Sequence, residues 1–193
     1  LTGLMGLSVT VYSLTCIDPR QESLGYYPLL NVLLMGVNGA FLTGDLFNLF
    51  VGFEVMLIAS YVLLTAKTGA GEVRATMSYV VINLVASALF LVIIAFVYMT
   101  TGTMNLADLS RVMVDVDPAI RNGLGMLTLA VFGIKAALFP LFMWLPDSYP
   151  TAPTPVTAIF AGLLTKVGVF VIIRTQTLLF SGDEPSSLLL SVA

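Results

Sequence analysis

The sequence predicts an all-α membrane protein with several spanning helices. Of its 193 residues, 58% are hydrophobic and only 10% are charged, whereas soluble domains carry about a quarter charged residues. The polar residues gather in short segments between apolar runs, and most runs approach the roughly 20 residues that a helix needs to cross a bilayer. We therefore expect a polytopic fold with about six transmembrane helices and the start of a seventh, in a single transmembrane region.

Several kinds of site are missing from the sequence. The formal net charge is −3 and no basic stripe is present, which argues against nucleic acid as a partner. The chain has no histidine and a single cysteine, Cys16, so the usual metal ligand and the usual near-neutral proton carrier are absent. Because no motif for a nucleotide, flavin, quinone or iron–sulfur cluster occurs, we expect no cofactor.

Apolar runs define the expected spans. The spans cover residues 1–17, 27–43, 46–66, 76–99, 119–145 and 154–174, and another begins at 187. Pro19 follows the first run and stops its helix. Gly36 and Gly39 in the second favour close packing with a neighbouring helix. Asp45 is a suitable N-cap for the third, and the polar segment 67–74 separates the third from the fourth.

Residues 104–116 differ from the spans because they are too short and too polar to cross. Apolar residues such as Leu106 and Leu109 recur there at helical spacing beside Asp108 and Arg111. This pattern is typical of an amphipathic helix at the membrane interface. The chain begins at Leu1 rather than methionine and ends in a new apolar run, so we expect it to be part of a longer protein.

Three charged residues lie inside the apolar runs. Glu54 lies about 12 Å into the third span at a rise of 1.5 Å per residue, near the middle of a core about 30 Å thick. Lys135 lies near the centre of the uncharged run of the fifth span, and Lys166 lies near mid-depth in the sixth. Each such charge costs about 2.5–3.5 kcal/mol, and intramembrane ionisable residues are therefore functional candidates by default.

These three charges suit proton translocation. Burial disfavours the charged form of a lysine and a nearby carboxylate favours it, so a lysine that alternates between these surroundings takes up and releases a proton. We predict that Glu54 modulates Lys135, which passes its influence or its proton through water to Lys166. The alternative is an ion pair between Glu54 and one lysine that only fixes helix packing, but this would leave the other lysine unpaired.

Proline and glycine accompany both lysines and predict broken helices. Pro140 cannot donate to the carbonyl of Ala136, one residue past Lys135, so this carbonyl needs another partner or water. The expected helix-break residues are Pro140, Pro153, Pro155, Gly162 and Gly168.

Polar residues within the spans are candidates for lining a proton path. They are Asn31, Asn38, Asn83, Ser87, Thr128, Thr157 and Thr165. For each of them, packing or interhelical hydrogen bonding is the alternative.

Two stretches carry a resemblance to a known family. One is Gly39-Ala-Phe-Leu-Thr-Gly-Asp-Leu-Phe-Asn-Leu-Phe50, followed by Glu54. The other contains, in order, Lys135-Ala-Ala-Leu-Phe-Pro-Leu141, Trp144-Leu-Pro-Asp147, Ala152-Pro-Thr-Pro-Val156 and Leu163-Leu-Thr-Lys-Val-Gly168. The sequence resembles the proton-conducting, antiporter-like membrane subunits shared by respiratory complex I and the Mrp-type multisubunit sodium/proton antiporters. Within that family it is most similar to the D subunits of the Mrp type.

The resemblance implies roles for the three buried charges. Glu54 matches the essential membrane glutamate of the family, Lys135 the lysine of the broken helix, and Lys166 the connecting lysine of the next span. Gly52 stands where the family would have phenylalanine, and this difference implies looser packing beside Glu54. The family fold contains two inverted repeats of helices, of which this chain would hold one. A multi-pass location in a prokaryotic plasma membrane, with other membrane subunits as partners, is also implied.

We therefore expect a proton-translocating subunit of a multisubunit antiporter that exchanges protons for sodium or another monovalent cation. Such a protein would be a secondary transporter subunit. The alternative is a redox-driven, proton-pumping subunit of an NADH:quinone oxidoreductase-like respiratory complex. A third reading is a structural membrane subunit without transport.

Overall fold

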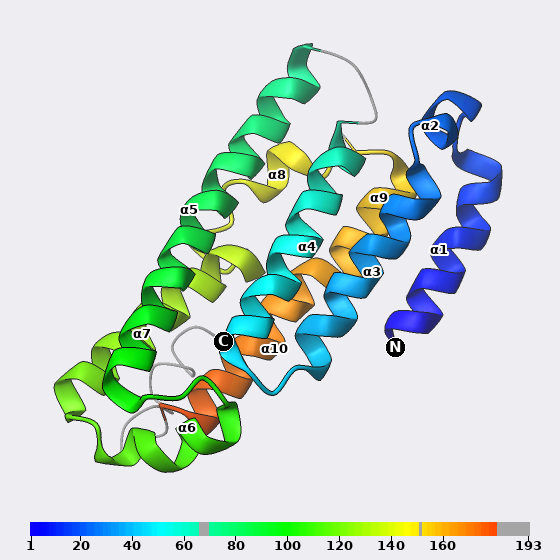
Figure 1. Ribbon diagram of the computed structural model, residues 1–193. Coiled ribbons are helices and arrows are strands. Elements are labelled where there is room, and N and C mark those ends of the chain that lie inside the picture. Colours follow the sequence, from blue (N-terminus) through cyan, green and yellow to red (C-terminus); the bar gives the residue numbers. More distant parts are fainter. Residues whose placement is uncertain (66–69, 151, 181–193) are drawn as a thin grey trace.

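Helices make up the regular structure of the part of the chain that is described, residues 1–65, 70–150 and 152–180 of the computed structural model (Figure 1). The predicted all-α class is confirmed. The longer helices are α1 (Thr2–Cys16), α3 (Tyr26–Leu42), α4 (Leu46–Leu64), α5 (Ala70–Thr101), α7 (Pro118–Ala136) and α10 (Thr165–Leu178). The shorter ones are α2 (Pro19–Ser23), α6 (Leu106–Val112), the 3-10 helix η1 (Met113–Asp115), α8 (Leu145–Ser148), α9 (Thr154–Ile159) and the π-helix η2 (Phe160–Leu164).

Within the described part of the chain, three helical stretches are long and apolar enough to cross a membrane. They are α4, residues Thr76–Thr101 of α5, and the continuous stretch Thr154–Leu178 formed by α9, η2 and α10. The apolar helices α1 and α3 are shorter, with 15 and 17 residues. Since a bilayer core requires about 20 residues, length and composition identify these three as the clearest candidate spans.

Some helix bounds differ from those expected from the sequence. The fifth expected span, 119–145, divides into α7, which ends at Ala136, and the separate short helix α8. The sixth is continued to Leu178 by α10. The expected interfacial segment 104–116 contains α6 and η1, with Leu106, Leu109 and Met113 buried. The seventh span, expected from 187, lies outside the described residues.

Helices α3 and α4 cross closely because both carry glycine at the crossing. A Cβ on Gly36 would lie 2.8 Å from the backbone nitrogen of Met56 and 2.9 Å from the carbonyl oxygen of Gly52. A Cβ on Gly52 would lie 3.1 Å from the backbone nitrogen of Ala40. Any larger side chain at Gly36 would force the backbones apart. This crossing holds α4, and with it Glu54, against the bundle.

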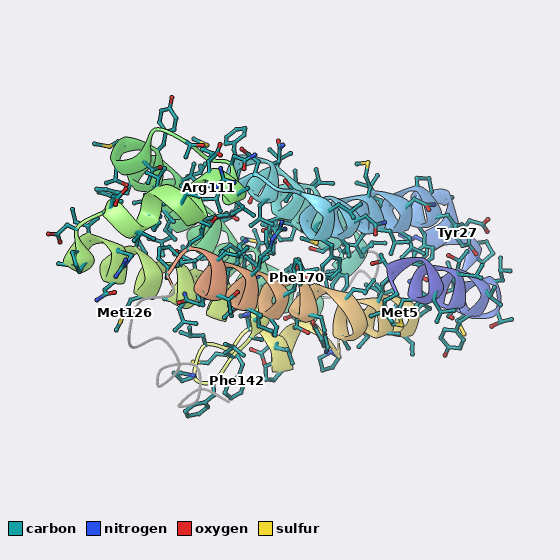
Figure 2. All side chains as sticks on the ribbon, turned by 90° about the horizontal axis from the view of Figure 1, so that it is seen from below. Met5, Tyr27, Arg111, Met126, Phe142 and Phe170 are labelled. Carbon is teal, nitrogen blue, oxygen red and sulfur yellow. The ribbon has the colours of Figure 1, made fainter. Side chains whose placement is uncertain are left out.

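The N-terminal helix α1 packs against α9 and its continuation into η2 (Figure 2). The methyl carbon of Met5 (labelled in Figure 2) occupies the space that a Cβ on Gly162 of η2 would need. Ser13 of α1 bonds to the hydroxyl of Tyr26 on α3 at 2.7 Å. These contacts hold α1 against both α3 and η2.

One end of the bundle is closed by paired connections. The amide of Leu46 donates to Met104 O at 3.0 Å, and the amide of Leu106 donates to Gly44 O at 2.8 Å. Toward the C-terminal end of α10, the guanidinium of Arg174 donates to the carbonyl of Thr43. This network joins the starts of α4 and α6 to α10, at the lower end of the molecule in Figure 1.

Candidate functional site

The helix that carries Lys135 stops immediately after it. Ala137 adopts a left-handed conformation with φ of 56°. The amide of Leu138 donates to Gly133 O at 2.9 Å and the amide of Ala137 donates to Ile134 O at 3.1 Å. This pair of bonds is a Schellman motif, which satisfies the last carbonyls of a helix. Lys135 therefore lies in the last turn of α7, where the helix dipole favours a cation.

Two neighbours hold this helix end in place. The indole nitrogen of Trp144 donates to the carbonyl of Ile134 at 2.9 Å, so this carbonyl has a side-chain partner inside the bundle. From α10, Gly168 packs on the backbone of Ala136, and a Cβ there would lie 2.8 Å from the Ala136 nitrogen. The end of α7 is consequently locked between α10 and the segment that follows it.

The ammonium group of Lys135 is buried between α4 and α5. Only 5% of the side chain is exposed. Its Nζ donates to Ser87 Oγ on α5 at 3.1 Å and lies 4.9 Å from the centroid of the Phe53 ring on α4. A cation over a ring in such a desolvated place is stabilised by about 2 kcal/mol. One hydrogen bond and one ring face thus support the charge.

Glu54 follows Phe53 and lies near this lysine without forming an ion pair with it. The carboxylate of Glu54 interacts electrostatically with the Lys135 ammonium. Its Oε1 is buried and has no hydrogen-bond partner among the described residues. Neither lysine contacts a carboxylate within the described part of the chain. The structure therefore does not contain the alternative arrangement, in which Glu54 forms an ion pair with one lysine and only fixes helix packing.

A small cavity adjoins Lys135. Its volume is about 20 Å³, which is enough for about one water molecule. Lys135, Asn83, Tyr79, Trp144, Phe53, Met56, Leu57 and Leu164 line it. Because Lys135 and Asn83 bring an amine and an amide to a largely apolar wall, a water bound there has hydrogen-bond partners.

Lys166 lies apart from this pair, on the outer surface of the described bundle. Its Nζ donates to the carbonyl of Ala161 and, at 3.2 Å, to the hydroxyl of Thr165. The wider π-helix η2 leads directly into this residue, and such π segments are frequent at functional sites. The exposed face of α10 that carries Lys166 also carries Val169 and Ile173.

The candidate path-lining residues separate into two groups. Ser87 and Asn83 are buried at the Lys135 site, and Thr165 is buried beside Lys166. The remaining four are elsewhere: Asn31 and Asn38 are exposed on α3, Thr128 bonds to Leu124 O of its own helix, and Thr157 bonds to Tyr149 O.

The candidate helix-break residues occupy three kinds of position. Pro140 lies in the turn beyond α7, four residues after the helix has ended. Pro153 is the N-cap of α9, and Pro155 lies in its first turn. Gly162 lies in η2, whereas Gly168 lies inside the continuous α10 and serves the close contact with Ala136.

Sequence reasoning missed three residues that build this site. Phe53 supplies the ring beneath Lys135, Trp144 caps the helix end, and Tyr79 lines the cavity. The spacing of Tyr79, Asn83 and Ser87, four residues apart each time, marks one face of a helix. This spacing could have identified Tyr79 as part of the site, because the three buried polar side chains form one stripe on an apolar helix.

Comparison with known proteins identifies the family of the chain. A family model described as NADH:quinone oxidoreductase/Mrp antiporter, transmembrane, matches residues 43–193. The D component of the Na(+)/H(+) antiporter of Alkalihalophilus pseudofirmus is 46% identical over 184 residues, covering 95% of this chain and 37% of the relative. The chain thus spans just over a third of the length of that relative.

Two solved structures are similar over almost the entire chain. The Mrp complex from a Dietzia species matches with a TM-score of 0.85 and 35% identity, over 99% of this chain and 36% of the other. An archaeal respiratory membrane complex, the membrane-bound sulfane sulfur reductase, matches with a TM-score of 0.92 and 30% identity, over 99% and 40%. The chain is a membrane protein that belongs to the NADH:quinone oxidoreductase/Mrp antiporter transmembrane family.

Proposed function

We propose that this chain is the proton-translocating part of a subunit in a multisubunit antiporter that exchanges protons for sodium or another monovalent cation. One observation carries the proposal. Lys135 is buried at a helix end beside Ser87 and a water-sized cavity, with the carboxylate of Glu54 near it but unpaired. A lysine with such a choice of surroundings can gain and lose a proton as the nearby charge changes.

Lys166 extends the proposed route beyond the described bundle. A charge on an apolar helix face is costly in lipid, so such a residue is expected to face protein or water. The 46% identity to an antiporter component of which this chain covers 37% supports a larger parent. We infer that the exposed Lys166 faces a further part of the parent protein, to which it passes the proton or its influence.

Redox-driven proton pumping is the second candidate. The match of TM-score 0.92 to an archaeal respiratory membrane complex supports this candidate, because a respiratory complex contains a chain with a similar arrangement of helices. The two candidates differ in the driving force, because the antiporter uses a cation gradient and the pump requires an electron donor.

The test is collapse of a pH gradient on adding sodium or potassium to inverted vesicles that contain the full parent complex, without electron donor. We expect cation-dependent proton movement in the wild type and its loss in Lys135→Ala and Glu54→Gln at equal complex abundance. Thr128→Val, a matched change on α7 whose hydroxyl bonds within its own helix, should retain activity.

Other outcomes select other functions. Proton movement that appears only with an electron donor would favour the respiratory pump. Full specific activity in Lys135→Ala and Glu54→Gln would exclude the proposed route and leave these charges with a packing role.

A further inference from the structure

Two polar side chains lie exposed on neighbouring apolar helices, Asn38 on α3 and Lys166 on α10. Lys166 lies in the middle of the candidate span Thr154–Leu178. The carboxamide of Asn38 forms no hydrogen bond with another residue in the described part of the chain. Because an unpaired carboxamide is costly in lipid, Asn38 is expected to bond to a polar group on another helix.

The contacts of α1 place both polar residues on the same outer side of the bundle. The adjacent α1 residues Met5 and Gly6 pack against Gly162 of η2 and the side chain of Leu34 on α3, respectively. Each polar residue follows the contact on its own helix by four residues. Residues four apart are neighbours on one helix face, so the two polar side chains lie next to each other just beyond α1.

A ring contact farther along the two helices gives the same result. Phe41 of α3 and Phe170 of α10 (labelled in Figure 2) meet edge to face, with centroids 5.0 Å apart. Asn38 lies three residues before its ring and Lys166 lies four residues before its ring. Both helices run in the same direction (Figure 1). At a rise of 1.5 Å per residue, the two polar residues therefore lie within about 2 Å of the same depth.

A carboxamide would offer Lys166 a kind of hydrogen bond that a backbone carbonyl cannot. At present Nζ donates to the carbonyl of Ala161 and to the hydroxyl of Thr165. A carbonyl only accepts hydrogen bonds, whereas a carboxamide has both an acceptor oxygen and donor N–H groups. Asn38 can thus accept a hydrogen bond from the ammonium and can also donate one to the lone pair of the neutral amine.

We propose that Asn38 is a positioning residue that holds the amine of Lys166 after the lysine has released its proton. The proposal rests on the proposed function, because it requires that Lys166 exchanges protons. In this step the ammonium gives one proton to a water molecule, and the bond from Nζ to the Ala161 carbonyl breaks. Nδ2 of Asn38 then donates a hydrogen bond to the lone pair of Nζ without losing its proton. The flexible four-carbon stem of a lysine allows this movement between neighbouring helices.

The first test measures proximity and does not depend on transport. Asn38→Cys and Lys166→Cys are combined in the full parent complex after Cys16 and every other cysteine have been replaced. A two-carbon bismethanethiosulfonate reagent then joins thiols that lie across a short gap. The cross-linked chain is quantified by mass spectrometry, relative to the labelling of each single-cysteine variant by methyl methanethiosulfonate. We expect the cross-link to form.

The matched control combines Asn31→Cys with Lys166→Cys. Asn31 lies on the same exposed stripe of α3, about 10 Å farther along the helix axis than Asn38. Its cross-link yield should be at least about tenfold lower, because the short linker cannot span this gap. Equal yields in the two pairs, or no cross-link from Asn38→Cys, would overturn the proposal. Neither result would affect the loss of transport in Lys135→Ala, so the two proposals fail separately.

The second test asks whether the carboxamide acts on transport. Asn38→Leu removes the carboxamide at similar volume. Cation-dependent proton movement should then fall about tenfold at equal complex abundance, which is the effect of one lost hydrogen bond. Asn38→Gln keeps a carboxamide and should restore most of the rate. The thermal transition of the complex should not fall in either variant, because the side chain is exposed.

Asn31→Leu is the control for transport, since the carboxamide of Asn31 donates to the carbonyl of Tyr27 in its own helix at 2.9 Å. It should match the wild type. A wild-type rate in Asn38→Leu would overturn the role of Asn38, even if the cross-link forms. Equal slowing in Asn38→Gln and Asn38→Leu would also overturn it, because the carboxamide would then not be the cause.

Discussion

The ammonium of Lys135 and the hydroxyl of Ser87 lie 3.1 Å apart inside the bundle, although 48 residues separate them in the sequence. The bond joins the broken end of α7 to the middle of α5. Among the described residues it is the hydrogen bond that holds this buried charge, with the Phe53 ring as the other contact. The site therefore depends on a few identifiable contacts, each of which a single substitution can remove.

Ser87→Ala removes the hydrogen-bond acceptor of Lys135 without removing the charge. A hydrogen bond to a charged group contributes about 1.5–3 kcal/mol, so proton movement should fall by about tenfold or more. Ser87→Thr keeps a hydroxyl and should restore most of the rate. Ser13→Ala, at a serine that is also buried but lies on α1, is the control and should match the wild type in the vesicle assay.

Gly168→Ala should disturb the contact between α10 and the end of α7. The added Cβ would lie within 2.9 Å of three atoms of Ala136, two of them backbone atoms that cannot rotate away. Overpacking of this kind costs about 1–3 kcal/mol, and the thermal transition of the purified complex should fall. Gly123→Ala lies on α7 with no atom within 4 Å of its Cβ and should be neutral or slightly stabilising. A transition unchanged in Gly168→Ala would contradict the close contact.

Ala137→Gly and Ala130→Gly should have opposite effects on stability. Ala137 has a left-handed backbone at the helix end, where glycine is about 1 kcal/mol more favourable than an L residue. Ala130 lies inside α7, where glycine costs about 1 kcal/mol relative to alanine. Thermal unfolding of the two variants, measured side by side, checks the sign. If both substitutions lower the transition equally, α7 does not end at Ala136.

Trp144→Phe should weaken the site through the backbone. The substitution removes the indole N–H that the carbonyl of Ile134 accepts, at 2.9 Å, and enlarges the cavity beside Lys135. The carbonyl of Ile134 keeps the amide of Ala137 as a donor, so the loss is that of one hydrogen bond, about 0.5–1.5 kcal/mol. We therefore expect a lower thermal transition together with slower proton movement. Phe142→Leu, in the same connection but on the outside of the bundle (Figure 2), should change neither measurement.

The glycine at position 52 illustrates what a local pattern misses. The resemblance to the family implies looser packing beside Glu54 at this glycine. In the structure the Gly52 oxygen and the Gly36 position face each other across the α3–α4 crossing, and a side chain at either position would contact the opposite backbone. Gly52 thus permits a close approach, and the close approach positions Glu54.

The sequence by itself determined the class of the fold and singled out the three charged residues that lie within apolar runs. Long apolar runs with few charges can satisfy their backbone groups in lipid only as helices, and a charge within such a run is noticeable because it is costly. The sequence also contained the ordered motifs around Lys135 and Lys166 that placed the chain in its family.

Only the tertiary structure decided how these charges are arranged. α7 ends at Ala136, ahead of Pro140, because Trp144 and Gly168 bind and pack its last turn. Lys135 turns inward to Ser87, whereas Lys166 lies on the outer face of α10. The helical period specifies which residues share a face, but the neighbours that pack on a helix select the face that is buried. Those neighbours are distant in sequence, and hydropathy along the chain therefore could not assign them.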